Sequence, residues 1–188
     1  GILFDGAWLW EEYLNLTLVK AGFTHPENKT CKGKIYPFKG KKRYARYPDF
    51  KRDGVIADAT YKHLIRKSGN GDRVQEGLDR DDLNQMISYL HITSSDVGIF
   101  ISPTILNVMN PETGEFYKDT DFVIRKDKLF AYRVGELDGY GGEIFIMGVN
   151  VPWSVESYAD FVSAMQKTED VLLQSINKII DVPIMESS

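Results

Sequence analysis

Two aspartates, Asp49 and Asp58, are the residues of this sequence whose type and spacing most suggest chemistry. The Asp53-Gly54 step between them is a turn signal flanked by two β-like runs, which predicts a hairpin. Pairing of the two arms would bring the aspartates opposite one another near one end of a sheet. Neighbouring carboxylates raise each other's pKa and are unfavourable unless a cation lies between them, so this arrangement predicts a divalent metal ion.

A site made of oxygen ligands favours Mg²⁺, Mn²⁺ or Ca²⁺ over zinc. A metal held there can generate a hydroxide nucleophile and stabilise the charge that develops on a phosphoryl group. Because side chains alternate along a strand, Asp58, Thr60 and Lys62 are expected on one face. The flexible stem of Lys62 could fold back, and its ammonium would then orient the attacking water or offset transition-state charge. The alternative is structural, with turn and edge acids and a solvated lysine.

A basic and aromatic stretch leads into the first aspartate. Between positions 29 and 52 the chain carries ten basic residues and the single acid Asp49, although its formal net charge is −4. Such a run usually forms a solvated hairpin, and it also supplies the local positive charge that phosphate contacts need. Of its aromatic residues, Tyr44 and Tyr47 are expected to pack in the core rather than stack on bases.

The elements that must position these residues follow from hydrophobic periodicity and turn signals. Helices are expected at residues 8–21, ended by Gly22, and from a cap at Asp79 or Asp81 to His91. A polar linker is expected at 66–77, and the last helix from a Ser154 cap to about residue 180, with core positions at Phe161, Met165 and Leu172. Strands are expected at residues 55–61, 97–102 (ended by Pro103), 122–124, 129–134 and 144–149.

This order of elements predicts an α/β or α+β fold with a mixed sheet, in a single domain spanning residues 1–188. The lone cysteine, Cys31, excludes an internal disulfide framework or a cysteine zinc site, and the three histidines show no ligand spacing. No apolar run is long enough to cross a bilayer, so we expect a soluble, intracellular protein. A first residue of Gly1 instead of Met suggests a piece of a longer chain.

Two neighbouring segments resemble the nuclease core of McrC-type and LlaJI-type restriction subunits, which belong to the PD-(D/E)XK superfamily. They are Arg46-Tyr47-Pro48-Asp49-Phe50 and, after it, Val55-Ile56-Ala57-Asp58-Ala59-Thr60-Tyr61-Lys62. Leu9-Trp10-Glu11-Glu12-Tyr13-Leu14 resembles the preceding family helix, which supplies an acid. Asp82-Leu83-Asn84-Gln85-Met86-Ile87-Ser88-Tyr89 resembles the later D-L-x-Q-x-x-x-Y helix, and the strand after it ends in proline, as at Pro103. These matches run in family order over residues 8–103.

The resemblance implies a restriction-endonuclease-like mixed sheet flanked by helices, with its core at about residues 8–103 and further strands and a long helix at 104–188. It implies Mg²⁺, for which Mn²⁺ can substitute, held by Asp49, Asp58 and the carbonyl of Ala59. Glu11 would be the acid supplied by the first helix, as a further metal and catalytic residue. Gln85 and Tyr89 would line the site and position water or phosphate.

One departure from the family pattern concerns the catalytic lysine. The family places it two residues after the second acid, where this chain has Thr60. Either Lys62 has taken over its role, or the domain is catalytically weakened, naturally or by engineering. With the family in view, the basic stretch is expected to contact the DNA backbone through four residues: Lys41, Lys42, Arg43 and Arg46.

The resemblance therefore implies an endodeoxyribonuclease that hydrolyses DNA phosphodiester bonds by metal-activated water, in a restriction system of the prokaryotic cytoplasm. Its partners would be DNA and an AAA+ nucleotide-hydrolysing subunit, and that subunit could be the one that recognises modified cytosine. One alternative is a non-catalytic nuclease-like module that binds DNA or the AAA+ protein. Another is a nuclease acting on RNA or on DNA junctions, because a fold does not fix its substrate.

Overall fold

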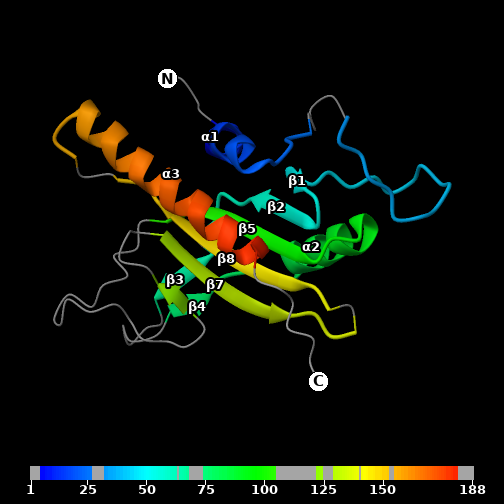
Figure 1. The fold of residues 1–188 in the computed structure, drawn as a ribbon. Coiled ribbons are helices and arrows are strands. Elements are labelled where there is room, and N and C mark those ends of the chain that lie inside the picture. The colour runs from blue at the N-terminus through cyan, green and yellow to red at the C-terminus, as the bar shows by residue number, and fades with distance from the viewer. Residues whose placement is uncertain are drawn as a thin grey trace.

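The computed structural model describes residues 5–26, 32–62, 64–67, 74–104, 122–124, 129–139, 141–152 and 155–181. A six-stranded mixed sheet with the order β1-β2-β5-β8-β7-β6 forms its centre. The helices α1 and α3 lie together over part of this sheet, and α2 lies beside β5 (Figure 1). The predicted mixed sheet flanked by helices is therefore present.

The three inner strands are parallel to one another, and each outer strand is antiparallel to the strand that it joins. In β2 (Val55–Ala59), β5 (Val97–Thr104) and β8 (Glu143–Asn150), the chain runs in the same direction. The antiparallel strands are β1 (Phe50–Arg52) beside β2, β7 (Leu129–Glu136) beside β8 and β6 (Phe122–Ile124) beside β7. The three strands expected in the second half of the chain are thus confirmed.

The helices begin and end at the residues whose types signal it. In α1 (Gly6–Leu18), the Asp5 carboxylate accepts hydrogen bonds from two first-turn N–H groups, and the short helix η1 (Val19–Ala21) follows. Gly22 ends this pair of helices at φ 80°, a left-handed conformation that glycine adopts without a steric penalty. Asp79 caps α2 (Arg80–Thr93) in the same way, which decides between the two predicted caps.

The hydrophobic core has two parts, one on each face of the sheet. Because strand residues alternate in direction, Ile99 and Ile101 of β5 pack with α1 and α3, whereas Phe100 packs with α2. Gly98 lets α2 approach closely, since a Cβ there would lie 2.8 Å from Cγ of Met86. The sheet is thus covered on both faces, as the apolar run at residues 97–102 predicted.

Several predicted boundaries were wrong. The expected linker at residues 66–77 contains strand residues, because β3 (Ile65–Lys67) and β4 (Val74–Glu76) pair antiparallel. Strand β5 continues through Pro103, where only β8 still lies beside it, since its pairing with β2 ends at Ile101. A missing N–H is tolerated where one side of a strand is unpaired.

The last helix, α3 (Tyr158–Asp181), begins later than predicted. The hydroxyl of Ser157 accepts a hydrogen bond from the N–H of Asp160 at 3.2 Å, as a helix cap does, and the predicted cap Ser154 lies outside the described residues. The core positions Met165 and Leu172 are buried, and Phe161 is partly buried. None of the described helices has the length and apolar character needed to span a membrane.

We expect Leu14→Ala to lower the free energy of unfolding by about 2 to 5 kcal/mol, because the Leu14 side chain is 0% exposed and its removal leaves a cavity. Leu16 on the same helix is 72% exposed, so Leu16→Ala is the matched control, with an expected change within about 0.5 kcal/mol. Urea unfolding of both variants measures the difference. Equal effects would contradict the packing of α1 described here.

Candidate functional site

The hairpin of β1 and β2 brings the two predicted aspartates together. Its register pairs Phe50 with Ala57 and Arg52 with Val55, around the turn at Asp53-Gly54. Continued by one residue, the same register sets Asp49 opposite Asp58, and side chains of directly opposed residues lie on the same face. The sequence-based prediction that these acids meet across neighbouring strands is therefore confirmed.

Hydrogen bonds fix both carboxyl groups. Asp49 Oδ2 accepts from the backbone N–H of Ala59 at 2.9 Å, and Asp58 Oδ2 accepts from the hydroxyl of Thr60 at 3.2 Å. The two carboxyl groups also lie close enough for each to shift the pKa of the other. Ala59 thus enters the site through its N–H, and a role for its carbonyl as a metal ligand stays a prediction.

The surroundings of the pair favour its protonated form. The pKa of Asp49 is raised from 3.8 to about 8, mainly by burial and then by the negative charge of Asp58, although the hydrogen bond from Ala59 opposes the shift. Burial also raises the pKa of Asp58, against the lowering effect of its hydrogen bonds from Thr60 and Asp49. The pair therefore holds a proton near neutral pH, as like charges in a shared buried site do.

Glu11 lies close enough for its charge to raise the pKa of both aspartates. The neighbouring residue, Trp10, fixes this part of α1, because its indole N–H donates to the carbonyl of Ile101 in β5 at 3.1 Å. The acid predicted on the first helix is therefore near the pair. In the described part of the chain, however, no three Asp, Glu, His or Cys side chains already form a group that could hold a metal ion.

His25 is a residue of this region that sequence reasoning missed. Its Nδ1 lies 2.8 Å from the carbonyl oxygen of Asp49, its Nε2 lies 3.5 Å from Glu11 Oε1, and its ring stacks on Phe50. Because a carbonyl can only accept, Nδ1 must carry the proton. Thr24 brings the histidine there by pairing with Lys51 of β1, a long-range contact that no sequence spacing signals.

Gln85 and Tyr89 share one face of α2, as predicted from their spacing. The Tyr89 side chain is 1% exposed; its hydroxyl accepts from the amide of Gln85 and donates to the carbonyl of Tyr47 at 3.1 Å. Burial, with smaller contributions from the charges of Asp58 and Asp49, raises the pKa of Tyr89 to about 12. The two residues therefore hold the segment that carries Asp49, and contact with water or phosphate stays a prediction.

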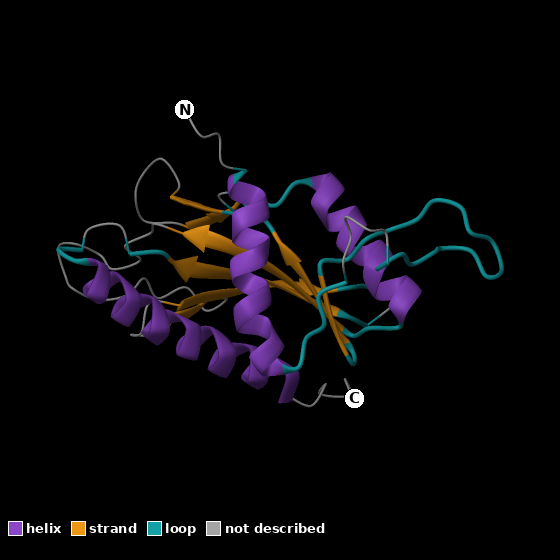
Figure 2. Ribbon diagram, turned by 90° about the horizontal axis from the view of Figure 1, so that it is seen from above, coloured by secondary structure: helices purple, strands orange, loops and turns teal. Residues whose placement is uncertain are grey.

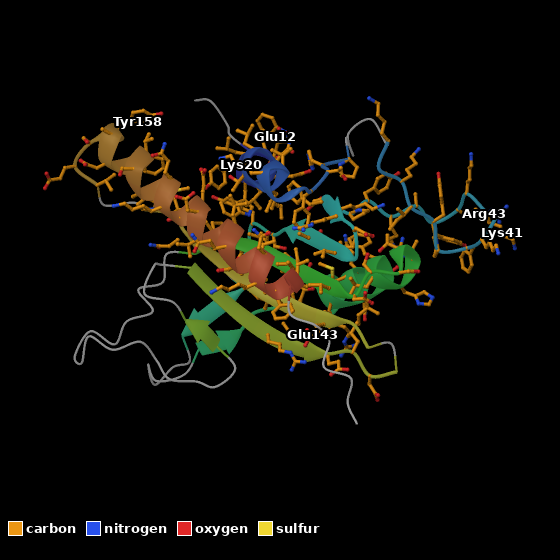
Figure 3. All side chains as sticks on the ribbon, in the orientation of Figure 1. Glu12, Lys20, Lys41, Arg43, Glu143 and Tyr158 are labelled. Carbon is orange, nitrogen blue, oxygen red and sulfur yellow. The ribbon has the colours of Figure 1, made fainter. Side chains whose placement is uncertain are left out.

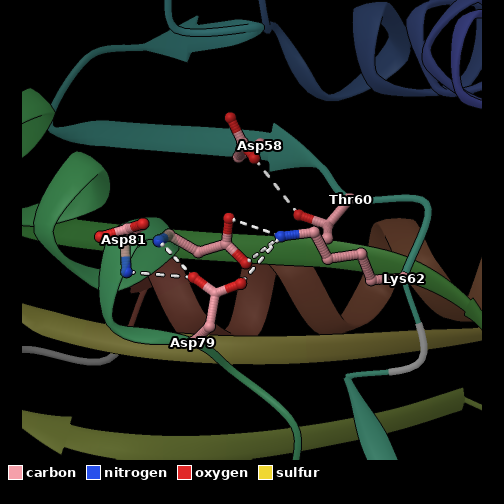
Figure 4. Close-up of polar contacts among 6 residues, drawn as sticks. Asp58, Thr60, Lys62, Asp79 and Asp81 are labelled. Carbon is pink, nitrogen blue, oxygen red and sulfur yellow. Dashed lines mark hydrogen bonds and ion pairs between the residues drawn. The ribbon is translucent and has the colours of Figure 1, made fainter.

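The structure corrects the geometry expected for Lys62. Strand β2 ends at Ala59, so strand alternation does not carry Lys62 onto the face of Asp58. Its ammonium pairs with Asp79 at 3.0 Å and with Asp82 at 2.8 Å, and these hydrogen bonds raise its pKa. Figure 4 shows the side chain directed toward Asp79, whereas Asp58 contacts Thr60. A catalytic role for Lys62 stays a prediction.

The described part of the basic stretch includes a projecting loop, here called the basic hairpin, formed by residues 32–46. Backbone pairing between Ile35 and Arg46 joins its arms, and the loop extends away from the sheet in two views (Figures 2 and 3). The four predicted DNA contacts, Lys41, Lys42, Arg43 and Arg46, are all exposed. The expectation that Tyr44 packs in the core was wrong, since its side chain is 67% exposed. Lys29 lies outside the described residues.

The acid pair, Glu11 and α2 all lie in the part of the chain that one protein family covers. A family model described as the McrBC 5-methylcytosine restriction system component matches residues 1–102, more than half of the chain. The chain belongs to this family. Membership makes it a component of a restriction system, a kind of assembly with partner subunits. No curated protein and no solved structure matches the chain.

The acid pair predicts an unusual dependence of stability on pH in metal-free buffer. The folded protein keeps a proton on Asp49 up to about pH 8, whereas the unfolded chain releases it near pH 3.8, so the free energy of unfolding due to this group falls as pH rises through that window. Asp49→Asn keeps the acceptor for Ala59 and removes the titration. Relative to the wild type, we expect this variant to gain stability steadily toward about pH 8.

Urea unfolding of both proteins across the window, with EDTA present, gives the difference in stability at each pH. Taking this difference removes the contributions of titrating groups that do not interact with the pair, because the two proteins share them, and leaves the titration of the Asp49–Asp58 pair. A difference that stays constant with pH, or that shrinks toward alkaline pH, would contradict the proton-sharing pair.

Proposed function

We propose that this chain is a Mg²⁺-dependent endodeoxyribonuclease subunit of a restriction system, and that Asp49 and Asp58 form its metal site. The observation that carries the proposal is the meeting of the two largely buried carboxyl groups across β1 and β2. Family membership supports it, because a restriction system requires a component that cuts DNA. The proposed fold is of the PD-(D/E)XK type, whose acids stand on such a hairpin.

The residues present fit a divalent cation. Two carboxyl groups with raised pKa values form a site where negative charge is uncompensated, and oxygen ligands suit Mg²⁺ or Mn²⁺. Asp49, Asp58 and the carbonyl of Ala59 would hold the ion, with Glu11 close enough to act directly or through water. The bound ion would supply positive charge that lowers the pKa of water and offsets charge on a phosphoryl group.

The chain's own residues keep this site in one geometry. The N–H of Ala59 orients the Asp49 carboxyl group, and the hydroxyl of Thr60 orients that of Asp58. The hydroxyl of Tyr89 holds the carbonyl of Tyr47, two residues before Asp49, and the ring of His25 holds the carbonyl of Asp49 itself. Such supporting hydrogen bonds reduce the rearrangement needed when a cation and a phosphate enter the site.

The proposed partners are DNA and an AAA+ nucleotide-hydrolysing subunit, in the cytoplasm of a prokaryote. The basic hairpin supports the assignment of DNA, because its exposed cations precede the acid pair directly in the chain. Recognition of methylated or otherwise modified cytosine is assigned to the AAA+ partner, since the residues of the acid site carry no group arranged to read bases.

A catalytically weakened module that binds DNA or the AAA+ protein is the second candidate. Two observations favour it. Thr60 stands where a catalytic lysine is expected, and two aspartates already engage the ammonium of Lys62. This candidate keeps the fold and the DNA contacts of the first but not the cleavage.

The first test is nicking of supercoiled plasmid with Mg²⁺ or Mn²⁺, with and without the AAA+ partner. We expect Asp58→Ala to lower the cleavage rate by at least about 100-fold, a loss typical of removing electrostatic stabilisation from an active site. Asp138→Ala, in an exposed turn between β7 and β8, is the control and should cleave like the wild type. Undiminished cleavage by Asp58→Ala would remove the proposed site.

The second test asks whether Lys62 supplies the positive charge that stabilises the scissile phosphate during cleavage. If Lys62 leaves its aspartate partners and acts on the scissile phosphate, Lys62→Ala should lower cleavage about 100-fold. Its stability should change little, because exposed ion pairs contribute little. Asp79→Asn removes one ion-pair partner of the lysine and should keep most of the activity. Full cleavage activity of Lys62→Ala would show that the lysine has only a structural role in its ion pairs. If the wild type does not cleave DNA and Thr60→Lys restores cleavage, the chain is the catalytically weakened module.

A further inference from the structure

The basic hairpin carries two exposed aromatic side chains beside its cations. Phe38 is 52% exposed and Tyr44 is 67% exposed, and their rings contact each other edge to face with centroids 6.0 Å apart. The backbone pairs Phe38 with Lys41 around Gly40, whose φ of 74° permits the tight turn. The aromatic pair therefore belongs to the closed end of the hairpin.

The charge of the basic hairpin is of one sign. Residues 32–46 include seven Lys and Arg residues and no acid, in a chain whose net charge is −4. In the part of the chain that the structure describes, no ion pair engages Lys39, Lys41, Lys42 or Arg43. Cations kept apart from the chain's own acids are available to phosphates.

The backbone of Tyr44 supports a role for the exposed ring. Its φ of 57° is left-handed, a conformation that is uncommon and costs energy in a non-glycine residue, and strained residues of this kind cluster at active sites and ligand clamps. This conformation accompanies the contact with Phe38 and leaves most of the Tyr44 side chain in water. Aromatic faces exposed beside cations are the groups on which proteins stack bases or with which they wedge apart base steps.

The geometry points to the basic hairpin as a duplex-DNA contact, in which the cations bind backbone phosphates and the Phe38–Tyr44 pair presses between base pairs in a groove. This inference rests on the proposed function for its substrate class. Lys41 stands eight residues before Asp49, so the hairpin end lies at most about 28 Å from the acid pair along a fully extended chain. That reach is less than one helical turn of DNA, about 34 Å.

Duplex DNA fits these observations better than an acidic protein surface. An acidic protein would bind the cations, but its binding would not explain why the rings of Phe38 and Tyr44 are exposed or why the backbone of Tyr44 is left-handed. The hairpin also continues directly into Tyr47-Pro48-Asp49, so a polymer of phosphates lying along it would reach the acid pair. The alternative partner becomes an outcome of the test.

The test is fluorescence anisotropy with a labelled duplex and the full chain, in a background of Asp58→Ala that prevents cleavage. A triple variant changes Lys41, Lys42 and Arg43 to Ala. Its control changes Lys20, Lys167 and Lys178 to Ala, three exposed lysines on α1–η1 and α3 (Figure 3 labels Lys20). A double variant changes Phe38 and Tyr44 to Ala, with Tyr158→Ala as its control, because Tyr158 is 82% exposed on α3.

We expect the triple variant to bind at least about tenfold more weakly at low salt. Between roughly 50 and 200 mM salt, its slope of log affinity against log salt should be smaller by about 3, because three phosphate contacts are lost. The double variant should also bind about tenfold more weakly, through lost stacking, but with an unchanged salt slope. The fluorescence of a 2-aminopurine base placed in the duplex should increase when the duplex binds the Asp58→Ala protein, and should not increase when it binds the double variant.

Affinity and salt slope of the triple variant equal to those of its control would overturn the phosphate contact. An unchanged affinity and 2-aminopurine signal in the double variant would overturn the base contact. Binding of poly-glutamate as tight as that of the duplex, and lost in the triple variant, would assign the surface to an acidic protein instead. Circular dichroism of each variant verifies that it folds.

These outcomes are separate from the failure of the proposed nuclease. Binding is measured without cleavage, so a wild type that never cuts DNA with Mg²⁺ or Mn²⁺ would remove the nuclease proposal and leave the hairpin result intact. Conversely, cleavage by the wild type together with unchanged binding by both hairpin variants would remove only this inference.

Discussion

The pairing of β1 with β2 is the constraint on which the rest of the site depends. It brings two carboxyl groups together where burial already disfavours negative charge, so Asp49 and Asp58 share a proton in the cation-free protein. This arrangement is unfavourable for the folded chain at alkaline pH, and we propose that a divalent cation relieves it. A buried pair of acids that lowers the stability of the ligand-free protein, and whose repulsion a bound ligand offsets, is typical of functional sites.

The surrounding elements maintain that pairing from both faces of the sheet. On one face α1 is fixed to β5 through Trp10, which places Glu11 near the pair, and on the other α2 holds the backbone before Asp49 through Tyr89. Although β1 is an edge strand, residues of the hairpin belong to the core on both faces, with Phe50 and Ala57 on one face and Ile56 on the other.

Most of the fold was predictable because its signals are local. The turn at Asp53-Gly54, the cap at Asp79 and the stop at Gly22 depend on residue type alone, and each was confirmed. The errors came where tertiary pairing decides the outcome. Strand β5 passes through Pro103 because its neighbour β2 has already ended, and the expected linker contains β3 and β4 because they pair with each other.

The sequence by itself determined that the two aspartates stand opposite one another, because a short hairpin with a fixed turn leaves a single register for its arms. Only the tertiary structure decided what surrounds them. His25 reaches Asp49 through pairing with a distant strand, Lys62 is held by acids of α2, and Tyr44 projects into water. These placements depend on contacts between segments far apart in the chain, and residue spacing carries no information about such contacts.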